Sequence, residues 1–280
     1  MLWLKLAYKE IVNNFRFSLF FIINLSIGLI GFIALDSFKN SIDTHLNNNS
    51  RAILTADAQI SARTPLTDLE YTLADNIFDT NYEFSDQISF FSMVAGNEAS
   101  RMGQLIGIDE SYPQYGEFIL QEGGVLSDEL RQQLINNNSI WVAQDLMLTL
   151  NLSIGETIRI GESDYTITDV IETDPSSTIS VMSNFPPIYM GLKQIQATGL
   201  IQLGSRVTYS RFYKFDEDVE MESWEEEFRL AEIEKFGDSR SMSMTTHQEQ
   251  SEDLGEILAY MNDYLGLIAL IALFLAGVGA

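Results

Sequence analysis

Few residues of this sequence have the types and spacing that metal binding or catalysis requires. The chain of 280 residues contains two histidines, His45 and His247, and no cysteine. Neither histidine has a second histidine four residues away, as a zinc-binding helix would need. The absence of cysteine excludes thiolate metal sites and disulfides. We therefore expect no metal site and expect both histidines to be solvated.

The motifs of nucleophilic catalysis and of nucleotide binding are also missing from the sequence. It contains no G-x-S-x-G elbow, no G-x-x-x-x-G-K-[ST] phosphate loop and no dinucleotide fingerprint. The acidic runs FDEDVEME and WEEEF lack the spacing and central glycine of a calcium-binding EF-hand, which favours a solvated helix face. The sequence thus predicts no catalytic or cofactor-binding residue, no cofactor, and a chain that is not an enzyme.

The distribution of charge limits the possible partners. Asp and Glu number 40 against 16 Lys and Arg, for a net charge of −24. Nucleic-acid binding draws on Lys and Arg to neutralise phosphates, so the composition argues against nucleic acid as a partner. Lys5, Lys9 and Arg16 precede a first apolar run, and no charged residue follows Asp263. The acidic surplus therefore belongs to the middle of the chain.

The first apolar run, residues 18–35, has 18 residues without a charge. That length is just enough for a helix to cross a hydrocarbon layer of ~30 Å. A cleaved signal peptide and a buried core helix are the alternatives, but the leader is long and no A-x-A-like site follows. We predict a transmembrane helix with the N-terminus in the cytoplasm, because basic residues precede the run, and an exported middle segment.

A second apolar run, residues 265–280, ends the sequence without a closing charge. We expect a second transmembrane helix that returns toward the cytoplasm and is truncated, so that the chain is the first part of a longer one. Residues 1–17 are expected to form a cytoplasmic amphipathic leader, with a simple extension of the first span as the alternative.

Apolar residues continue at helical spacing outside both runs. Because one helix leaves the membrane and the other enters it, the two stripes predict an antiparallel stalk of roughly 12 residues a side, about 18 Å long. The alternative is that each stripe packs on the surface of the exported domain. The stripe residues are Leu35, Phe38, Ile42 and Leu46 after the first run, and Leu254, Ile257, Leu258 and Met261 before the second.

Small and polar residues share one face of each predicted span. Such residues let helices approach closely in lipid, so these faces are predicted to pack against partner helices. They are Asn24, Gly28 and Gly31 in the first span and Ala269, Ala272, Ala276 and Gly279 in the second.

The pattern between the stalks predicts an α+β membrane protein with a large extracytoplasmic mixed α/β domain at residues 48–250. The flanking parts are residues 18–47, the first span and stalk, and residues 251–280, the second stalk and span.

Within this domain we expect a strand pair or one long strand at residues 51–62 and helices capped by Thr67 and Ser127. Hairpins are expected around residues 96–97 and within residues 157–170. Further expected elements are a strand and a helix in residues 140–150, a strand in residues 206–215 and a helix in residues 224–237. In that helix Trp224, Phe228 and Ala231 face inward and the glutamates outward.

Three segments of the predicted domain carry recognisable motifs. SFFSMVAGNEASRMGQLIGIDESYPQYGEFIL has a strand hairpin followed by an Asp, a Tyr-Pro and a Gly, and NLSIGETIRIGESDYTITDV has a Gly-acid pair and a hairpin. QATGLIQLGSRVTYSRFYKF has Ala-Thr-Gly-Leu and a Gly-Ser-Arg-Val strand. In this order the segments resemble the FtsX-like, MacB-type permeases of ABC transporters, and they are most similar to the YbbP-type members. The matching residues are Asp109, Tyr112, Pro113, Gly116, Gly155, Glu156, Gly204, Ser205, Arg206 and Val207. Glu156 departs from the family, which more often has aspartate, and the chain is several hundred residues shorter.

The resemblance implies a permease subunit in a bacterial inner membrane with a MacB-like periplasmic core domain. It implies a separate dimeric cytoplasmic ATPase whose motion the stalk passes to that domain, contact with membrane lipids, and a periplasmic partner protein. It also implies export or extraction of a hydrophobic or lipid-like substrate. A membrane sensor with one ligand domain between two spans is the alternative from another class, and a membrane-anchored hydrolase is weakened by the missing nucleophile.

Overall fold

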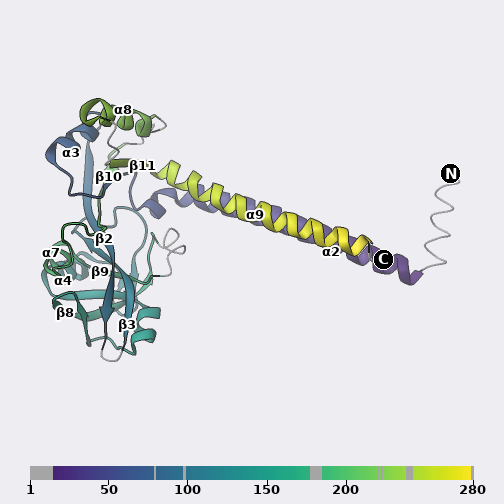
Figure 1. The fold of residues 1–280 in the computed structure, drawn as a ribbon, viewed down its shortest axis with the longest axis horizontal. Coiled ribbons are helices and arrows are strands. Elements are labelled where there is room, and N and C mark those ends of the chain that lie inside the picture. The colour runs from purple at the N-terminus through teal and green to yellow at the C-terminus, as the bar shows by residue number, and fades with distance from the viewer. Residues whose placement is uncertain are drawn as a thin grey trace. The chain divides into compact units, whose positions relative to one another are not determined.

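The structure is a computed structural model that describes residues 15–278 apart from 79, 97–98, 177–184, 218, 220, 222 and 238–241. Contacts divide the chain into two units (Figure 1). One unit comprises Met1–Asn48 and Ser251–Ala280, and the other is Asn49–Gln250. We describe each unit by itself, and the predicted leader, residues 1–17, lies almost entirely outside the described residues.

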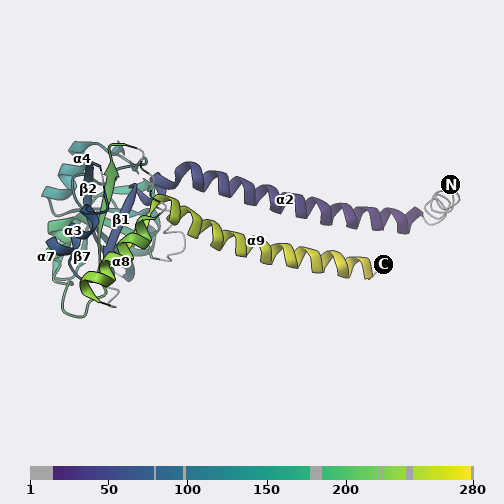
Figure 2. The ribbon, with the colours of Figure 1, turned by 90° about the horizontal axis from the view of Figure 1, so that it is seen from above.

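The first unit consists of parts of two long helices, α2 (Phe15–Leu54) and α9 (His247–Val278). Figure 2 shows them side by side and antiparallel. An apolar groove of about 110 Å³ lies between them. Within the described part of the chain, no helix combines the length and apolar character that crossing a membrane demands.

The second unit is built on a mixed sheet with the strand order β11-β1-β10-β2-β3-β9-β6-β8-β4-β5, to which β7 adds by pairing with β2 and β8. The pairs β3–β9 and β6–β8 are parallel and the other pairs antiparallel. The strands are β1 (Ala58–Ala62), β2 (Tyr82–Ala95), β3 (Ser100–Ile108), β4 (Ile119–Leu120), β5 (Gly124–Val125), β6 (Ser139–Ala143), β7 (Thr157–Ile160), β8 (Ser163–Thr173), β9 (Pro187–Gly191), β10 (Thr208–Phe215) and β11 (Met242–Thr246). The shorter helices are α3 (Asp68–Asp75), α4 (Asp128–Asn136), α5 (Gln144–Leu150), α7 (Leu192–Ala197) and α8 (Trp224–Phe236).

Buried side chains form clusters on both faces of this sheet. Successive strand residues point to opposite faces, so Leu105 enters the cluster that includes α5 and α7, and Ile106 enters a cluster around Tyr112 and Trp141. A third cluster packs α3 and α8 on β1, β10 and β11 through edge-to-face aromatic contacts such as Phe215 with Trp224. The mixed α/β fold expected from the sequence is thus confirmed.

Most local predictions for this unit are confirmed. Thr67 precedes α3, and its backbone N–H donates to Glu70 at 2.6 Å. Ser127 caps α4 by accepting from the N–H of Leu130 at 3.3 Å. The hairpins form as β2–β3 and β7–β8, and the strands and helices expected around residues 140–150, 206–215 and 224–237 are β6, α5, β10 and α8.

Two local predictions are wrong. Residues 51–54 are the last turn of α2, because the helix continues until Thr55, where a positive φ of 64° ends it. Glu232 of α8 does not face outward with the other glutamates of that helix. It is 2% exposed, and its Oε1 accepts a hydrogen bond from the N–H of Met242 at 3.0 Å. A buried carboxylate therefore holds the start of β11.

Candidate functional site

The candidate site is the junction where α2 passes into β1 and β11 passes into α9. Its central residue is Asp57, which is 2% exposed and lies one residue before β1. One carboxylate oxygen is 2.8 Å from Nε of Arg51, in the last turn of α2. The other accepts from the hydroxyl of Tyr115 and from the N–H of Phe215, both at 2.9 Å. One side chain thus ties a helix, a loop and a strand together.

The second long helix enters the same junction. β1 pairs with β11, with Ala58 opposite Thr246, and α9 begins at the next residue. The N–H of His247 donates to the carbonyl of Asp57 at 2.9 Å, and its Nδ1 is hydrogen-bonded to Oγ of Ser50 at 2.8 Å. Both long helices therefore continue into neighbouring strands of one sheet.

This arrangement corrects one sequence prediction. His247 was expected to be solvated, but it is 8% exposed, because its position directly after β11 places it against the last turns of α2. His45 is exposed, as expected. Among the described residues, no group of three or more His, Cys, Asp or Glu side chains is placed to hold a metal ion.

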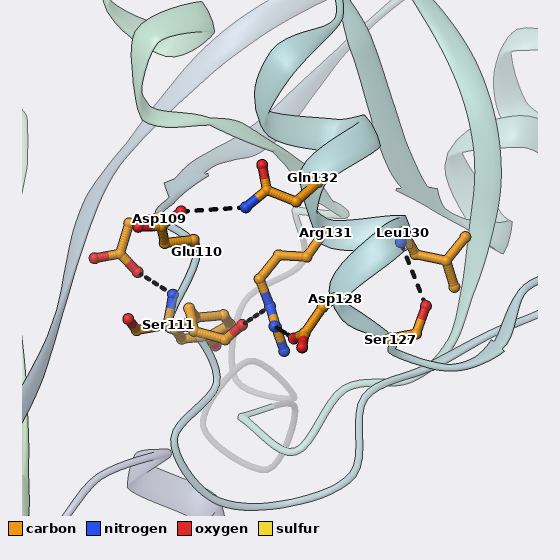
Figure 3. Close-up of polar contacts among 9 residues, drawn as sticks. Asp109, Glu110, Ser111, Ser127, Asp128, Leu130, Arg131 and Gln132 are labelled. Carbon is orange, nitrogen blue, oxygen red and sulfur yellow. Dashed lines mark hydrogen bonds and ion pairs between the residues drawn. The ribbon is translucent and has the colours of Figure 1, made fainter.

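The loop at residues 109–116 carries the Asp, Tyr-Pro and Gly of the family resemblance. Asp109 follows β3, and its carboxylate accepts from Oγ of Ser85 at 2.7 Å and from the N–H of Asp86 at 2.6 Å. It also accepts from the N–H of Ser111 at 3.0 Å, as Figure 3 shows. The aspartate thereby fixes the start of the loop to the neighbouring strand β2.

Helix α4 holds the middle of this loop. Nε of Arg131 donates to the carbonyl of Tyr112 at 2.9 Å, while its Nη1 pairs with Asp128 at 2.5 Å (Figure 3). The amide of Gln132 donates to Glu110 at 3.1 Å. Arg131 and Gln132 thus bind the loop directly, and Asp128 holds Arg131 in place.

The end of the loop lies against the last turn of α2. The N–H of Gln114 donates to the carbonyl of Thr55 at 3.2 Å. Gly116 has a φ of 88°, and a Cβ atom there would lie 2.5 Å from Cβ of Pro175 and 3.3 Å from Cβ of Ala52. Only glycine combines this backbone conformation with so close an approach.

The other residues of the resemblance support turns in the sheet. Gly155 has a φ of 90°, and its N–H donates to the carbonyl of Ile167 at 2.8 Å. Glu156 closes the same turn by accepting from the N–H of Ser153 at 2.7 Å. Ser205 donates to the carbonyl of Leu200 at 3.0 Å. These residues shape the domain at a distance from the junction.

The structure brings some of the predicted stalk residues together. Leu46 and Leu254 are buried, and the groove between α2 and α9 is lined by Phe38 and Ile42 on one helix and by Leu258 and Met261 on the other. Ile257 is exposed and Leu35 half-buried, and neither is among the described lining residues of the groove.

The small residues predicted to pack against partner helices are only partly described. A Cβ atom at Gly31 would meet no atom of the described residues within 4 Å. Gly279 lies outside the described residues, and the side-chain surroundings of five others are not described either: Asn24, Gly28, Ala269, Ala272 and Ala276.

Sequence reasoning missed the junction itself. Its one local signal is Asp57, an isolated acid within the run AILTADAQI, where a buried strand would not normally carry a charge. Its partners could not be found from the sequence, because Tyr115, Phe215 and His247 stand 58 to 190 residues away.

Comparison with known proteins identifies a family that matches most of the chain. The model of the MacB-like periplasmic core domain matches residues 18–230. The Escherichia coli (strain K12) protein described as an uncharacterized ABC transporter permease, YbbP, is 26% identical over 255 residues. That match covers 90% of this chain but 29% of the relative, so the chain spans less than a third of the relative's length.

Comparison with solved structures gives matches at low sequence identity. The periplasmic region of MacB from Actinobacillus actinomycetemcomitans has a TM-score of 0.47 at 14% identity, covering 75% of this chain and 97% of that one. The extracellular domain of the ABC-type transporter YknZ from Gram-positive bacteria has a TM-score of 0.45 at 11% identity, covering 68% and 100%. The family match confirms the resemblance indicated by the sequence motifs. Because the family model covers most of its length, this chain belongs to the family of the MacB-like periplasmic core domain.

Proposed function

We propose that the chain is the N-terminal part of a permease subunit of an ABC transporter. The family and the permease description of the E. coli relative support this function. The observation that carries its mechanism is the continuity of both long helices with adjacent strands, α2 with β1 and β11 with α9. A device that transmits movement needs such a connection, whereas a freely tethered domain does not.

The proposal places residues 18–35 and 265–280 in the bacterial inner membrane and residues 48–250 in the periplasm. The basic residues Lys5, Lys9 and Arg16 before the first run support a cytoplasmic N-terminus. The small residues of the two runs would then pack against further helices of the permease. The acidic surplus of the middle segment is compatible with an exported domain, because Lys and Arg hold a loop in the cytoplasm whereas Asp and Glu have little effect.

The mechanism follows from the junction. A separate cytoplasmic ATPase dimerises on binding ATP and displaces the helices, and α2 and α9 pass the displacement toward β1 and β11. The carboxylate of Asp57 joins Arg51, at the end of α2, to the hydroxyl of Tyr115 and the N–H of Phe215, so a displacement of the helix end acts on the loop and on β10. A hydrophobic or lipid-like substrate, exported or extracted, and a periplasmic partner protein belong to the same proposal through the family resemblance.

Topology is tested with single cysteines, because the natural chain has none. Leu203 is fully exposed in the core domain, so Leu203→Cys should react with a membrane-impermeant maleimide in spheroplasts from intact cells. The matched variant Lys5→Cys should react only after the membrane is permeabilised. Protection of the cysteine at position 203 in intact spheroplasts would refute the proposed topology and the transporter function with it.

Coupling is tested in the complete permease with its ATPase. Tyr115→Phe removes one hydroxyl from Asp57 and keeps the aromatic ring, so it should lower substrate movement several-fold while ATP hydrolysis continues. The control is Tyr260→Phe, at an exposed position of α9. Equal transport by both variants would show that the junction transmits no force, and the sensor alternative would then gain support.

A further inference from the structure

A cleft of about 390 Å³ opens on one face of the sheet in the core domain. Its floor is formed by Ile88 of β2 and Tyr209 of β10, which are paired in register. Leu66, just before α3, Leu192 of α7 and Ile201 also line it. Its volume lies in the range of sites for small organic molecules, and its lining combines these apolar side chains with the polar Gln87, Gln196 and Ser210.

The lining of the cleft includes one carboxylate. Asp86 is the only charged residue among the described residues that line it. Arg211 binds both carboxylate oxygens of Asp86, at 2.7 and 2.8 Å, and its guanidinium carbon lies 3.7 Å from the ring centroid of Tyr71 and 4.1 Å from that of Phe84. The carboxylate is thereby fixed in place, yet it keeps lone pairs for two further donors.

Other carboxylates lie near the Asp86–Arg211 pair. Asp109 lies beside it and accepts from the backbone N–H of Asp86 at 2.6 Å. Burial is the main cause that raises the pKa of Tyr71; Arg211 lowers this pKa, and the nearby carboxylates of Asp86, Glu70 and Asp68 each raise it. The chain as a whole carries a charge of −24. An anion would therefore be repelled from the carboxylate of Asp86 and a cation attracted.

We propose that this cleft binds a small amphiphile with an apolar body and a cationic amine end. The apolar body lies between Leu66 and Leu192 over Ile88 and Tyr209, and the amine donates to Asp86. This binding would be a separate property from the transmission of movement proposed above, because it needs neither the ATPase nor the long helices. It gives the core domain a ligand of defined chemistry.

The first test uses three probes with the same phenylethyl group on the whole chain: 2-phenylethylamine, 2-phenylethanol and 3-phenylpropanoate. They share the apolar body and differ in charge, and ligand-observed NMR measures their dissociation constants. The amine should bind about tenfold more tightly than the alcohol, as a charge-assisted hydrogen bond implies, and the carboxylate more weakly than both. Equal affinity of all three probes, or tighter binding of the carboxylate, would overturn the proposal.

Two tryptophan variants locate the site. Leu192→Trp fills the cleft and should weaken all three probes at least tenfold, whereas Leu203→Trp makes the same change at a fully exposed position outside it and should leave binding unchanged. Asp86→Asn should abolish the preference for the amine over the alcohol while the alcohol still binds. The alcohol affinity also reports whether this variant is folded. Unchanged amine binding in Leu192→Trp would place the ligand elsewhere and refute the assignment.

Discussion

Replacement of Asp57 by asparagine tests the junction most directly. The change keeps the size of the side chain and removes its charge. An aspartate accepts hydrogen bonds on both oxygens, but an asparagine presents a donor at one of them. Either the N–H of Phe215 and the hydroxyl of Tyr115, or the guanidinium of Arg51, must then face an NH₂ group.

The expected cost can be worked out from these contacts. Breaking a fully buried ion pair costs about 3–5 kcal/mol. Arg51 is 38% exposed and can regain water, so the cost here should be reduced to about 2–4 kcal/mol. For a domain of this size, ~1 kcal/mol lowers the melting temperature by about 2–4 °C, so Asp57→Asn should lower it by roughly 5–15 °C.

The assay is thermal unfolding of the whole chain, followed by near-ultraviolet circular dichroism, which reports the packing of the buried aromatic residues. The matched control is Asp164→Asn at an exposed position of β8, which should change the free energy of unfolding by less than about 0.5 kcal/mol. A double-mutant cycle with Arg51→Gln isolates the pairwise energy. If Asp57→Asn melts within 2 °C of Asp164→Asn, the carboxylate does not hold the junction and the reasoning is wrong.

Three further outcomes are expected. Gly116→Ala should cost about 1–3 kcal/mol more in urea unfolding than Gly204→Ala, because both residues have a positive φ but only Gly116 has neighbours within 4 Å of an added Cβ; equal costs would contradict this. Burial raises the pKa of Asp174 above its ordinary value of 3.8, so the folded state prefers the protonated acid and its contribution to stability should fall as pH rises above about 4. Asp174→Asn should flatten that part of the urea-midpoint profile between pH 4 and 7, and an unchanged slope would count against burial as the cause. An aspartate in place of Ile42 or Met261, which line the groove between α2 and α9, should uncouple transport from ATP hydrolysis in the complete transporter, and unchanged transport in both would show that the groove carries no force.

The local elements of the core domain could be predicted because their signals lie within a few residues. In β7 and β8 the residues Ile158, Ile160, Tyr165 and Ile167 alternate with polar neighbours, and all four are buried. Thr67 and Ser127 stand directly before α3 and α4; the carboxylate of Glu70 accepts from the N–H of Thr67, and the hydroxyl of Ser127 accepts from the N–H of Leu130. The apolar stripes of α2 and α9 could also be predicted, because their spacing of three and four residues is a local signal.

The junction could not be predicted, because its parts are far apart in the sequence. Nothing in TADAQI says that β1 lies between β10 and β11, and this order is what buries Asp57 and places His247 beside Ser50. The same holds for the cleft, whose floor joins Ile88 to Tyr209 across two strands.

The sequence by itself determined the helices, strands and caps, the acidic character of the chain and the family to which it belongs. Only the tertiary structure decided which polar residues are buried, which helices continue into neighbouring strands, and where Asp86 meets an apolar cleft. The physical reason is that periodicity and capping act over a few residues of one element. Burial and ion pairing are set by whichever distant segments the packed sheet brings into contact.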